Sequence, residues 1–175
     1  MRKLLVVVDF QNDFVDGSLG FPRAVLLEDK ICDKILKYRE DGHKIVFTID
    51  THDELYGTSQ EGRNLPVPHC IRGTTGHELY GRVLALSEDC PHFEKGTFGS
   101  DRLFFYMREN EFDCIELVGL VSNICVITNA ILAKTALPEA LIIVDASCTD
   151  SFDEQIHAKA LDVMEGLQIS VTNRS

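Results

Sequence analysis

The sequence predicts an α/β fold in three layers, with a mostly parallel sheet covered by helices on both faces. Two patterns carry this prediction: continuous apolar runs of strand length, and segments with apolar residues at helical spacing that alternate with those runs. Strands that are apolar along their whole length are typical of parallel sheets buried on both faces. The length of 175 residues suits one domain, and we expect a single domain over residues 1–175.

Each element is expected from a local pattern. The apolar runs predict strands at 3–9, 44–50, 113–119, 140–145 and 167–171. Helical spacing predicts helices at 25–40, 101–111, 123–136 and 153–166, with a short helix within 77–86. Asp41-Gly42 ends the first of these helices and Pro138 stops the third. The stretch 51–76 carries prolines and several glycines, and we expect it to be a loop.

Composition limits the classes of partner. Seventeen basic and 28 acidic residues give a net charge of −11, which disfavours nucleic acid and anionic membranes as partners. The longest apolar runs are far shorter than a membrane span, and no signal peptide is visible, so we expect a cytoplasmic protein. The six cysteines form no CxxC pair, and a disulfide framework is not expected in a chain with a full-sized core.

Chemically reactive side chains follow three of the predicted strands. Asp9 and Asp50 end the first two strands, and Cys125 follows the strand that ends near Gly119. Because ligands bind at the carboxyl ends of parallel strands, we expect the three side chains to face one crevice.

Cys125 lies where a strand turns into a helix. Ser122 or Asn123 is a plausible N-cap, which would put Cys125 in the first helical turn, where the dipole and free N–H groups stabilise a thiolate. The alternative is a buried structural cysteine in an apolar helix. Asp9 is either a base for this thiol or a turn residue. Lys95, between aromatic residues, is either a cation beside the thiolate or a solvated surface lysine.

A second group of side chains has the chemistry of a metal site. Asp50 and His52 stand two residues apart after the second strand, and Glu61 and His69 follow in the loop. Imidazole and carboxylate ligands suit zinc, manganese or iron. The alternative is a set of solvated loop residues.

Five motifs together resemble the isochorismatase-like cysteine hydrolases, and within them the nicotinamidase branch. The match runs over nearly the whole chain, and its parts are DFQNDF, DTH, LPVPHCIRGT, EKGTFGS and VGLVSNICVITNA. The resemblance implies the family's Rossmann-like fold and a catalytic triad of Asp9, Lys95 and Cys125. It also implies that family members often form homo-oligomers.

The same resemblance assigns the remaining site residues. A divalent zinc, manganese or iron ion would be held by Asp50, His52 and His69, with Glu61 as a further ligand, and would anchor a pyridine nitrogen. A cis Leu120–Val121 peptide would turn backbone N–H groups of Val121 and Cys125 toward the oxyanion. Phe14 and Leu120 would contact the substrate, a small amide that we expect to be nicotinamide.

One departure from the family pattern leaves other functions open. The chain has no tryptophan, and residues 64–67 stand where many nicotinamidases carry an aromatic wall. Tyr56, Phe98 and Tyr106 are candidates to replace that wall. An amidase for carbamoyl or ureido compounds is the nearest alternative function, and a non-catalytic metal-binding module on the same fold is the second.

Overall fold

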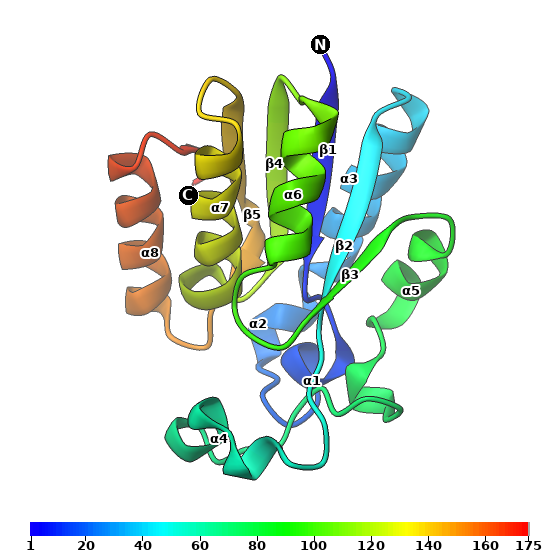
Figure 1. The fold of residues 1–175 in the computed structure, drawn as a ribbon, viewed down its shortest axis with the longest axis vertical. Helices are drawn as coiled ribbons and strands as arrows, with labels where there is room; N and C mark the ends of the chain where they lie inside the picture. Colours follow the sequence, from blue (N-terminus) through cyan, green and yellow to red (C-terminus); the bar gives the residue numbers. More distant parts are fainter. Residues whose placement is uncertain (175) are drawn as a thin grey trace.

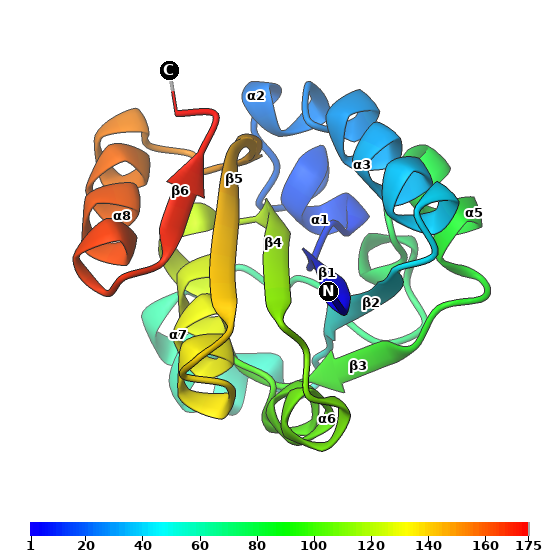
Figure 2. The ribbon, with the colours of Figure 1, turned by 90° about the horizontal axis from the view of Figure 1, so that it is seen from above.

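The computed structural model describes residues 1–174, which form a six-stranded, fully parallel sheet with the strand order β3-β2-β1-β4-β5-β6. Helices cover both of its faces, so the predicted three-layer α/β fold is confirmed (Figures 1 and 2). The strands are β1 (Lys3–Val8), β2 (Lys44–Asp50), β3 (His92–Lys95), β4 (Cys114–Leu120), β5 (Leu141–Asp150) and β6 (Ser170–Thr172).

Eight α-helices of the described chain connect these strands. They are α1 (Asn12–Val15), α2 (Pro22–Val25), α3 (Glu28–Glu40), α4 (Gln60–Asn64), α5 (Gly81–Ser87), α6 (Asp101–Asn110), α7 (Ile127–Ala136) and α8 (Glu154–Gly166). Two 3₁₀ turns (Tyr56–Thr58 and Thr75–His77) lie in the segment between β2 and α5, and a π-helical turn (Ser122–Val126) lies between β4 and α7. No helix within residues 1–174 has the length and apolar content needed to cross a membrane.

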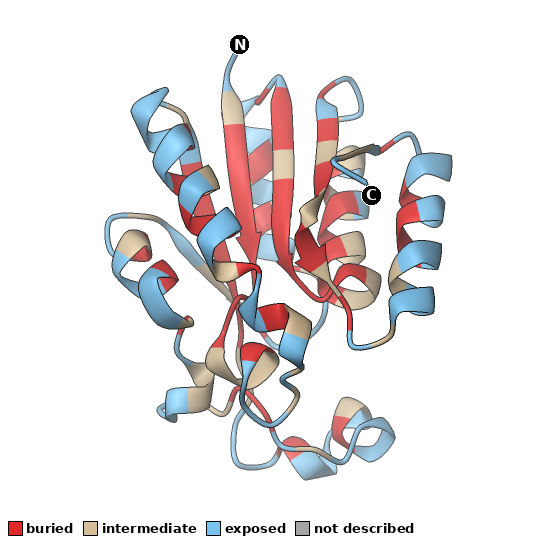
Figure 3. Ribbon diagram, turned by 180° about the vertical axis from the view of Figure 1, so that it is seen from behind, coloured by how far each residue is buried: buried red, intermediate tan, exposed pale blue. Residues whose placement is uncertain are grey.

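The core consists of two apolar clusters, one on each side of the sheet. Alternate residues of the central strands point to opposite faces, so that Leu4 and Val6 pack with α6, α7 and α8, while Leu5 and Val7 pack with α3. Figure 3 shows the consequence: the central strands are buried along almost their whole length, and the outer faces of the helices are exposed. This two-sided burial explains why the strands read as continuous apolar runs.

The predicted elements differ from the structure at several places. The stretch 51–76, expected to be a loop, contains the short helix α4, and α1 was not predicted. The last strand, expected at 167–171, is Ser170–Thr172.

The helix expected over 25–40 begins at Glu28, and Val25 is the last residue of a separate short helix, α2, which Pro22 starts. The strand β3 was not predicted; it is a four-residue edge strand with partly exposed residues, and it carries no apolar run. The short helix expected at 77–86 begins at Gly81, and β5 continues past Asp145 to Asp150 after a register shift opposite β4.

The strand order fixes where the functional side chains lie. Asp9 follows β1, Asp50 ends β2, Lys95 ends β3 and the π turn with Cys125 follows β4. These four strands are consecutive in the sheet and parallel, so their carboxyl ends meet at one edge. The segment between β2 and α5 folds beneath that edge, with α4 at its far end (Figure 1).

Candidate active site

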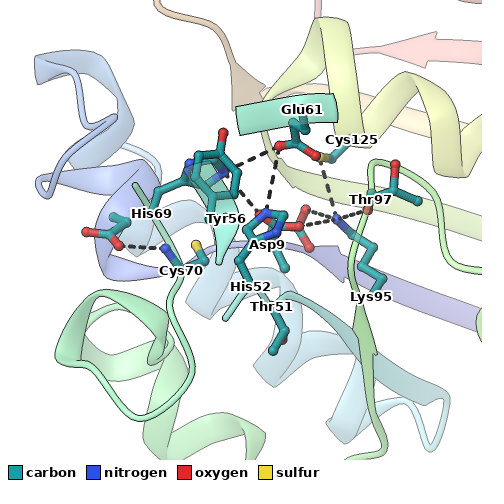
Figure 4. A network of polar contacts seen from close by, with 12 residues as sticks. Asp9, Thr51, His52, Tyr56, Glu61, His69, Cys70, Lys95, Thr97 and Cys125 are labelled. Carbon is teal, nitrogen blue, oxygen red and sulfur yellow. Dashed lines mark hydrogen bonds and ion pairs between the residues drawn. The ribbon is translucent and has the colours of Figure 1, made fainter. Parts of the chain in front are cut away.

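Asp9, Lys95 and Cys125 meet at the carboxyl edge of the sheet (Figure 4). Lys95 Nζ lies 2.7 Å from Asp9 Oδ2 and 3.6 Å from Cys125 Sγ. Thr48 Oγ1 donates to the other Asp9 oxygen at 2.6 Å, and Lys95 Nζ donates to the Thr97 carbonyl at 2.9 Å. The three predicted catalytic side chains are therefore in contact in a buried cluster.

Glycine is required where β4 passes β1. Gly119 has a φ of 109°, and a Cβ there would come within 2.1 Å of the Val8 carbonyl oxygen. No side chain fits in that space, so the two strands approach closely just before Asp9 and the Cys125 turn. This approach places the carboxylate and the thiol on neighbouring strand ends.

Burial and charge set the protonation of the cluster. Burial raises the pKa of Asp9 above its ordinary value, although the charge of Lys95 opposes the shift. Burial also raises the pKa of the Cys125 thiol, and the negative charge of Asp9 raises it further. Burial alone would discharge Lys95, but the charges of Asp9, Cys125 and Asp50 prevail and raise its pKa. Burial and the charge of Asp9 thus favour the neutral form of the Cys125 thiol, and the charge of Lys95 opposes them.

The turn that carries Cys125 differs from the predicted N-capped helix. The Leu120–Val121 peptide is cis, as the resemblance implies, and a π turn follows before α7. Val121 occupies the N-cap position, and in the described structure neither Ser122 nor Asn123 caps the turn. The buried Ser122 hydroxyl instead lies 2.8 Å from Nδ1 of His157 on α8, which satisfies both groups.

The predicted metal ligands converge beside the catalytic cluster. One ligand atom each from Asp50, His52 and His69 lies within 4.8 Å of the others. Asp50 Oδ2 is 3.0 Å from His52 Nε2 and 3.4 Å from His69 Nε2, and Glu61 Oε1 is 3.7 Å from both nitrogens. The second oxygen of Asp50 lies 3.4 Å from Lys95 Nζ, so Asp50 contacts both the histidines and the Asp9–Lys95–Cys125 cluster.

The donor set fits a divalent cation. The Nδ1 atom of His69 lies 2.8 Å from the Val67 carbonyl, which only accepts, so Nδ1 carries a proton. The other ring nitrogen, Nε2, faces Asp50 and would have to give up its proton to bind a cation. Burial favours the neutral form of Asp50, but hydrogen bonds from His52 and His69 prevail and lower its pKa, so it is a carboxylate. Burial, and then the charge of Asp50, raise the pKa of Glu61, a repulsion that a bound cation would relieve.

A pocket of about 660 Å³ opens onto both groups. Asp50, Glu61, His69 and Cys125 line its floor. The other lining residues are mostly apolar: Phe14, Leu19, Gly20, Gln60, Asn64, Leu65, Phe98, Val121, Ile124 and Phe152.

Two residues, Phe14 and Leu120, were expected to contact the substrate, and only the first of them lies in the pocket wall. Phe14 lines the pocket, with its ring 5.4 Å from that of His69. Leu120 does not: like Val118, two residues before it on β4, it points into the core cluster on the α3 side, and Val121 lines the pocket instead. Of the three aromatic candidates, Phe98 lines the pocket.

The other two candidates lie outside the pocket wall in the described part of the chain. Tyr56 packs behind the metal donors, with its ring 4.8 Å from His52 and its hydroxyl donating to the Leu65 carbonyl. Tyr106 packs against Phe93.

Comparison with known proteins identifies the family. The model of the isochorismatase domain family matches residues 3–174, which is nearly the whole chain. The chain belongs to the isochorismatase family. An isochorismatase family protein of Bacillus subtilis, PncA, is 33% identical over 174 residues that cover 92% of this chain and 93% of the relative.

Within the isochorismatase family, the relatives point to the nicotinamidase branch. The nicotinamidase of Saccharomyces cerevisiae is 26% identical, covering 98% of this chain and all of the relative. The crystal structure of the nicotinamidase/pyrazinamidase PncA of Bacillus subtilis superposes with a TM-score of 0.87 at 31% identity, covering 98% of this chain and 99% of that one. A pyrazinamidase of Pyrococcus horikoshii, solved in complex with zinc, has a TM-score of 0.86 at 25% identity, covering 99% of this chain and all of that one.

Two residues of the DFQNDF motif hold the site of this isochorismatase family member together but were not predicted. The buried Gln11 side chain accepts from the Asp50 N–H at 2.8 Å and donates to the Asp50 carbonyl at 2.9 Å. Asp13 accepts from the Cys70 N–H at 2.8 Å, next to His69. Gln11 and Asp50 are 39 positions apart in the sequence, so only the place of Gln11 in the DFQNDF motif could have indicated that it supports the site.

A third residue that was not predicted, Asn129 on α7, links the thiol to the lysine loop. Its Nδ2 donates to the Cys125 carbonyl at 2.8 Å and to the Phe98 carbonyl at 3.0 Å, and its Oδ1 accepts from the Ser100 N–H at 3.1 Å. The side-chain amide that makes these three hydrogen bonds is fully buried. Asn129 thus holds the π turn at a fixed distance from the segment that follows Lys95.

Proposed function

We propose that this amidohydrolase hydrolyses nicotinamide to nicotinate and ammonia, a step of NAD salvage, with Cys125 as the nucleophile. The observation that carries the proposal is the position of Lys95, which contacts Asp9 and Cys125 on one side and the metal-donor residue Asp50 on the other. One pocket thus offers a thiol for an amide carbon and a cation site for a ring nitrogen. The relatives named nicotinamidases support this choice of substrate.

In the first half of the reaction, Asp9 takes the proton of the Cys125 thiol as the sulfur attacks the amide carbon. The raised pKa of Asp9 makes it a better proton acceptor, and Lys95 balances the negative charge that remains on the cluster. Backbone N–H groups of Val121 and Cys125 would stabilise the oxyanion, with about 3 kcal/mol from each donor.

In the second half, Asp9 returns the proton to the departing nitrogen, and ammonia leaves. The carbon–nitrogen bond breaks and a thioester to Cys125 remains. Asp9 then takes a proton from water, whose oxygen attacks the thioester carbon. The carbon–sulfur bond breaks, the Cys125 thiol is reprotonated, and nicotinate is released.

Asp50, His52 and His69 would hold a divalent ion, with Glu61 as a further ligand, and their mixed nitrogen and oxygen donors suit zinc, manganese or iron. A bound ion supplies a Lewis-acid anchor for the pyridine nitrogen. Phe14, beside His69, would pack on the ring and help to orient the carboxamide toward Cys125.

Ammonia release from a panel of amides tests this function. The panel contains nicotinamide, a ureido acid and butyramide, each assayed with and without a chelator. We expect nicotinamide to have the highest kcat/KM and to depend on metal. Preferred turnover of the ureido acid would assign the chain to carbamoyl chemistry, and no turnover of any amide would contradict amidase function.

A further inference from the structure

The pocket has an apolar outer half that nicotinamide does not need. Exposure rises from the floor to the mouth: His69 is 2% and Cys125 6% exposed, whereas Leu65 is 38%, Phe98 43% and Phe152 60% exposed. These three side chains come from three separate segments, after α4, after β3 and after β5, and they line the same cavity. Large apolar side chains that gather at the rim of a pocket are typical of a ligand-binding surface.

The size of the pocket points the same way. Its volume of about 660 Å³ lies within the range of roughly 300–1,000 Å³ that is typical of sites for drug-sized ligands. A single pyridine ring with one carboxamide would leave much of that space filled with water against apolar walls. Asn64 and Leu65 line the same pocket as the buried His69 and Cys125, so the inner and outer residues face one cavity.

The geometry of the ring then decides which substituent would reach the rim. The metal donors and the thiol both lie on the floor, bridged by Lys95 at 3.4 Å from Asp50 and 3.6 Å from Cys125. If the ring nitrogen and the carboxamide both point to the floor, ring carbon 2 lies between these two anchors. Ring carbon 5 is opposite carbon 2, so it points to the mouth.

We propose that the outer half of this pocket is a subsite for an apolar group on ring carbon 5, so that the enzyme prefers pyridine-3-carboxamides enlarged at that position. The proposal rests on the proposed function for the orientation of the ring. Leu65 and Phe152 are its specificity-determining residues, because they are exposed side chains of the rim whose backbone is not bonded to the catalytic turn.

Two substrates and four proteins test the subsite. The measured quantity is the ratio of kcat/KM for 5-phenylnicotinamide to that for nicotinamide in the metal-loaded enzyme. We expect a ratio of about 10 or more, the order that one added apolar group gives in a hydrophobic pocket. Leu65→Ser and Phe152→Ser should each lower the ratio at least about threefold, while Leu167→Ser, an equally exposed leucine at the end of α8, should leave it unchanged.

The outcomes that overturn the subsite differ from those that overturn the function. A ratio of one or less in the natural enzyme overturns the subsite, and this is the result expected if a second copy of the chain covers the rim. A ratio that the rim variants leave unchanged overturns it as well.

If neither amide is hydrolysed, the proposed function fails, and calorimetric titration with 5-phenylnicotinate and nicotinate decides the subsite. Tighter binding of the phenyl compound, weakened by Phe152→Ser, supports it, and equal binding overturns it.

Discussion

The two groups that meet in the pocket are built differently. Asp9, Lys95 and Cys125 stand at the ends of three strands, and all are almost fully buried. The four candidate metal ligands, Asp50, His52, Glu61 and His69, form what we call the metal-donor group. All of them except Asp50 belong to the long segment between β2 and α5. The first set is thus held at or just beyond the carboxyl ends of the strands. Three residues of the second set are carried by a connecting segment that can change without disturbing the sheet.

Asp50 is the exception, and it couples the two groups. It ends β2, yet one of its oxygens faces the histidines while the other faces Lys95. A change in charge at either group is therefore felt by the other through one buried carboxylate. Variants in the strand-end group should impair hydrolysis of every amide. Variants in the metal-donor group should impair pyridine carboxamides selectively.

The largest effect is expected from removing the thiol. Cys125→Ala should lower kcat by at least about a thousandfold on nicotinamide and on butyramide, because both reactions would use the same nucleophile. Cys90→Ala, a partly exposed cysteine away from the pocket, is the matched control and should keep normal rates. Ammonia release by both variants, with circular dichroism to verify the fold, measures this. If the Cys125→Ala enzyme is active, Cys125 is not the nucleophile.

The next largest effect is expected from the base. Asp9→Asn should slow both substrates by at least about a hundredfold. Asp9 accepts a proton only when ionised, so activity should fall as the pH drops through its pKa, and burial sets that pKa above the ordinary value of 3.8. The acid limb of kcat/KM should therefore lie above pH 3.8 and be absent from the residual activity of Asp9→Asn. If the pH profile of Asp9→Asn keeps the same acid limb, a group other than Asp9 causes the loss of activity at low pH.

Removing the lysine tests the charge balance of the same cluster. Lys95→Ala should slow both substrates by a similar factor of about a hundred, and it would leave the buried carboxylates of Asp9 and Asp50 without their cation. Breaking a buried ion pair in this way costs about 3–5 kcal/mol of folding stability. Denaturant unfolding should show that loss, and Lys37→Ala, whose ion pair with Asp41 is exposed, should show almost none.

The strand-end group was easier to predict from the sequence than the rest of the site. Strands β1, β2 and β4 are buried on both faces, so their apolar runs mark them and locate Asp9, Asp50 and the Cys125 turn at one edge. Before the family motif, Lys95 was open between a cation beside the thiolate and a surface lysine, because its strand β3 lies at the sheet edge and has no apolar run. An apolar run in the sequence marks a strand that is buried, and most residues of β3 are only partly buried or exposed.

The remaining details depend on contacts between distant segments. Ser122 was expected to cap a helix, yet its hydroxyl pairs with His157, 35 positions away. The direction of the Leu120 side chain follows from the pairing of β4 with its neighbours, and the Gln11–Asp50 contact follows from how the loops close over the sheet. Such partners are chosen by the tertiary structure, so propensity and spacing do not indicate them.

A smaller and selective effect is expected from the metal-donor group. His52→Ala, or a chelator, should lower kcat/KM for nicotinamide by about a hundredfold. This is the upper end of the range for residues that only support a metal ligand, because here a direct ligand or the ion itself is lost. Butyramide turnover should change little, because that substrate has no ring nitrogen to anchor. His43→Ala, a histidine beyond the end of α3, is the control and should affect neither substrate. Equal losses on both substrates would mean that the donor group acts in the chemical step.

The smallest effect is expected from Gln11, which holds a donor residue without contacting the metal-facing oxygen. Gln11→Leu removes two hydrogen bonds to the Asp50 backbone, so that residue should be less well positioned and metal affinity should fall by about tenfold. Competition with a chelating dye measures that affinity, and the exposed Gln155→Leu on α8 is the control. Butyramide turnover should stay nearly normal if Gln11 serves the metal-donor group alone. A parallel loss on butyramide would instead show that Asp50 transmits the disturbance through Lys95, since that contact at 3.4 Å is the direct link between the two groups.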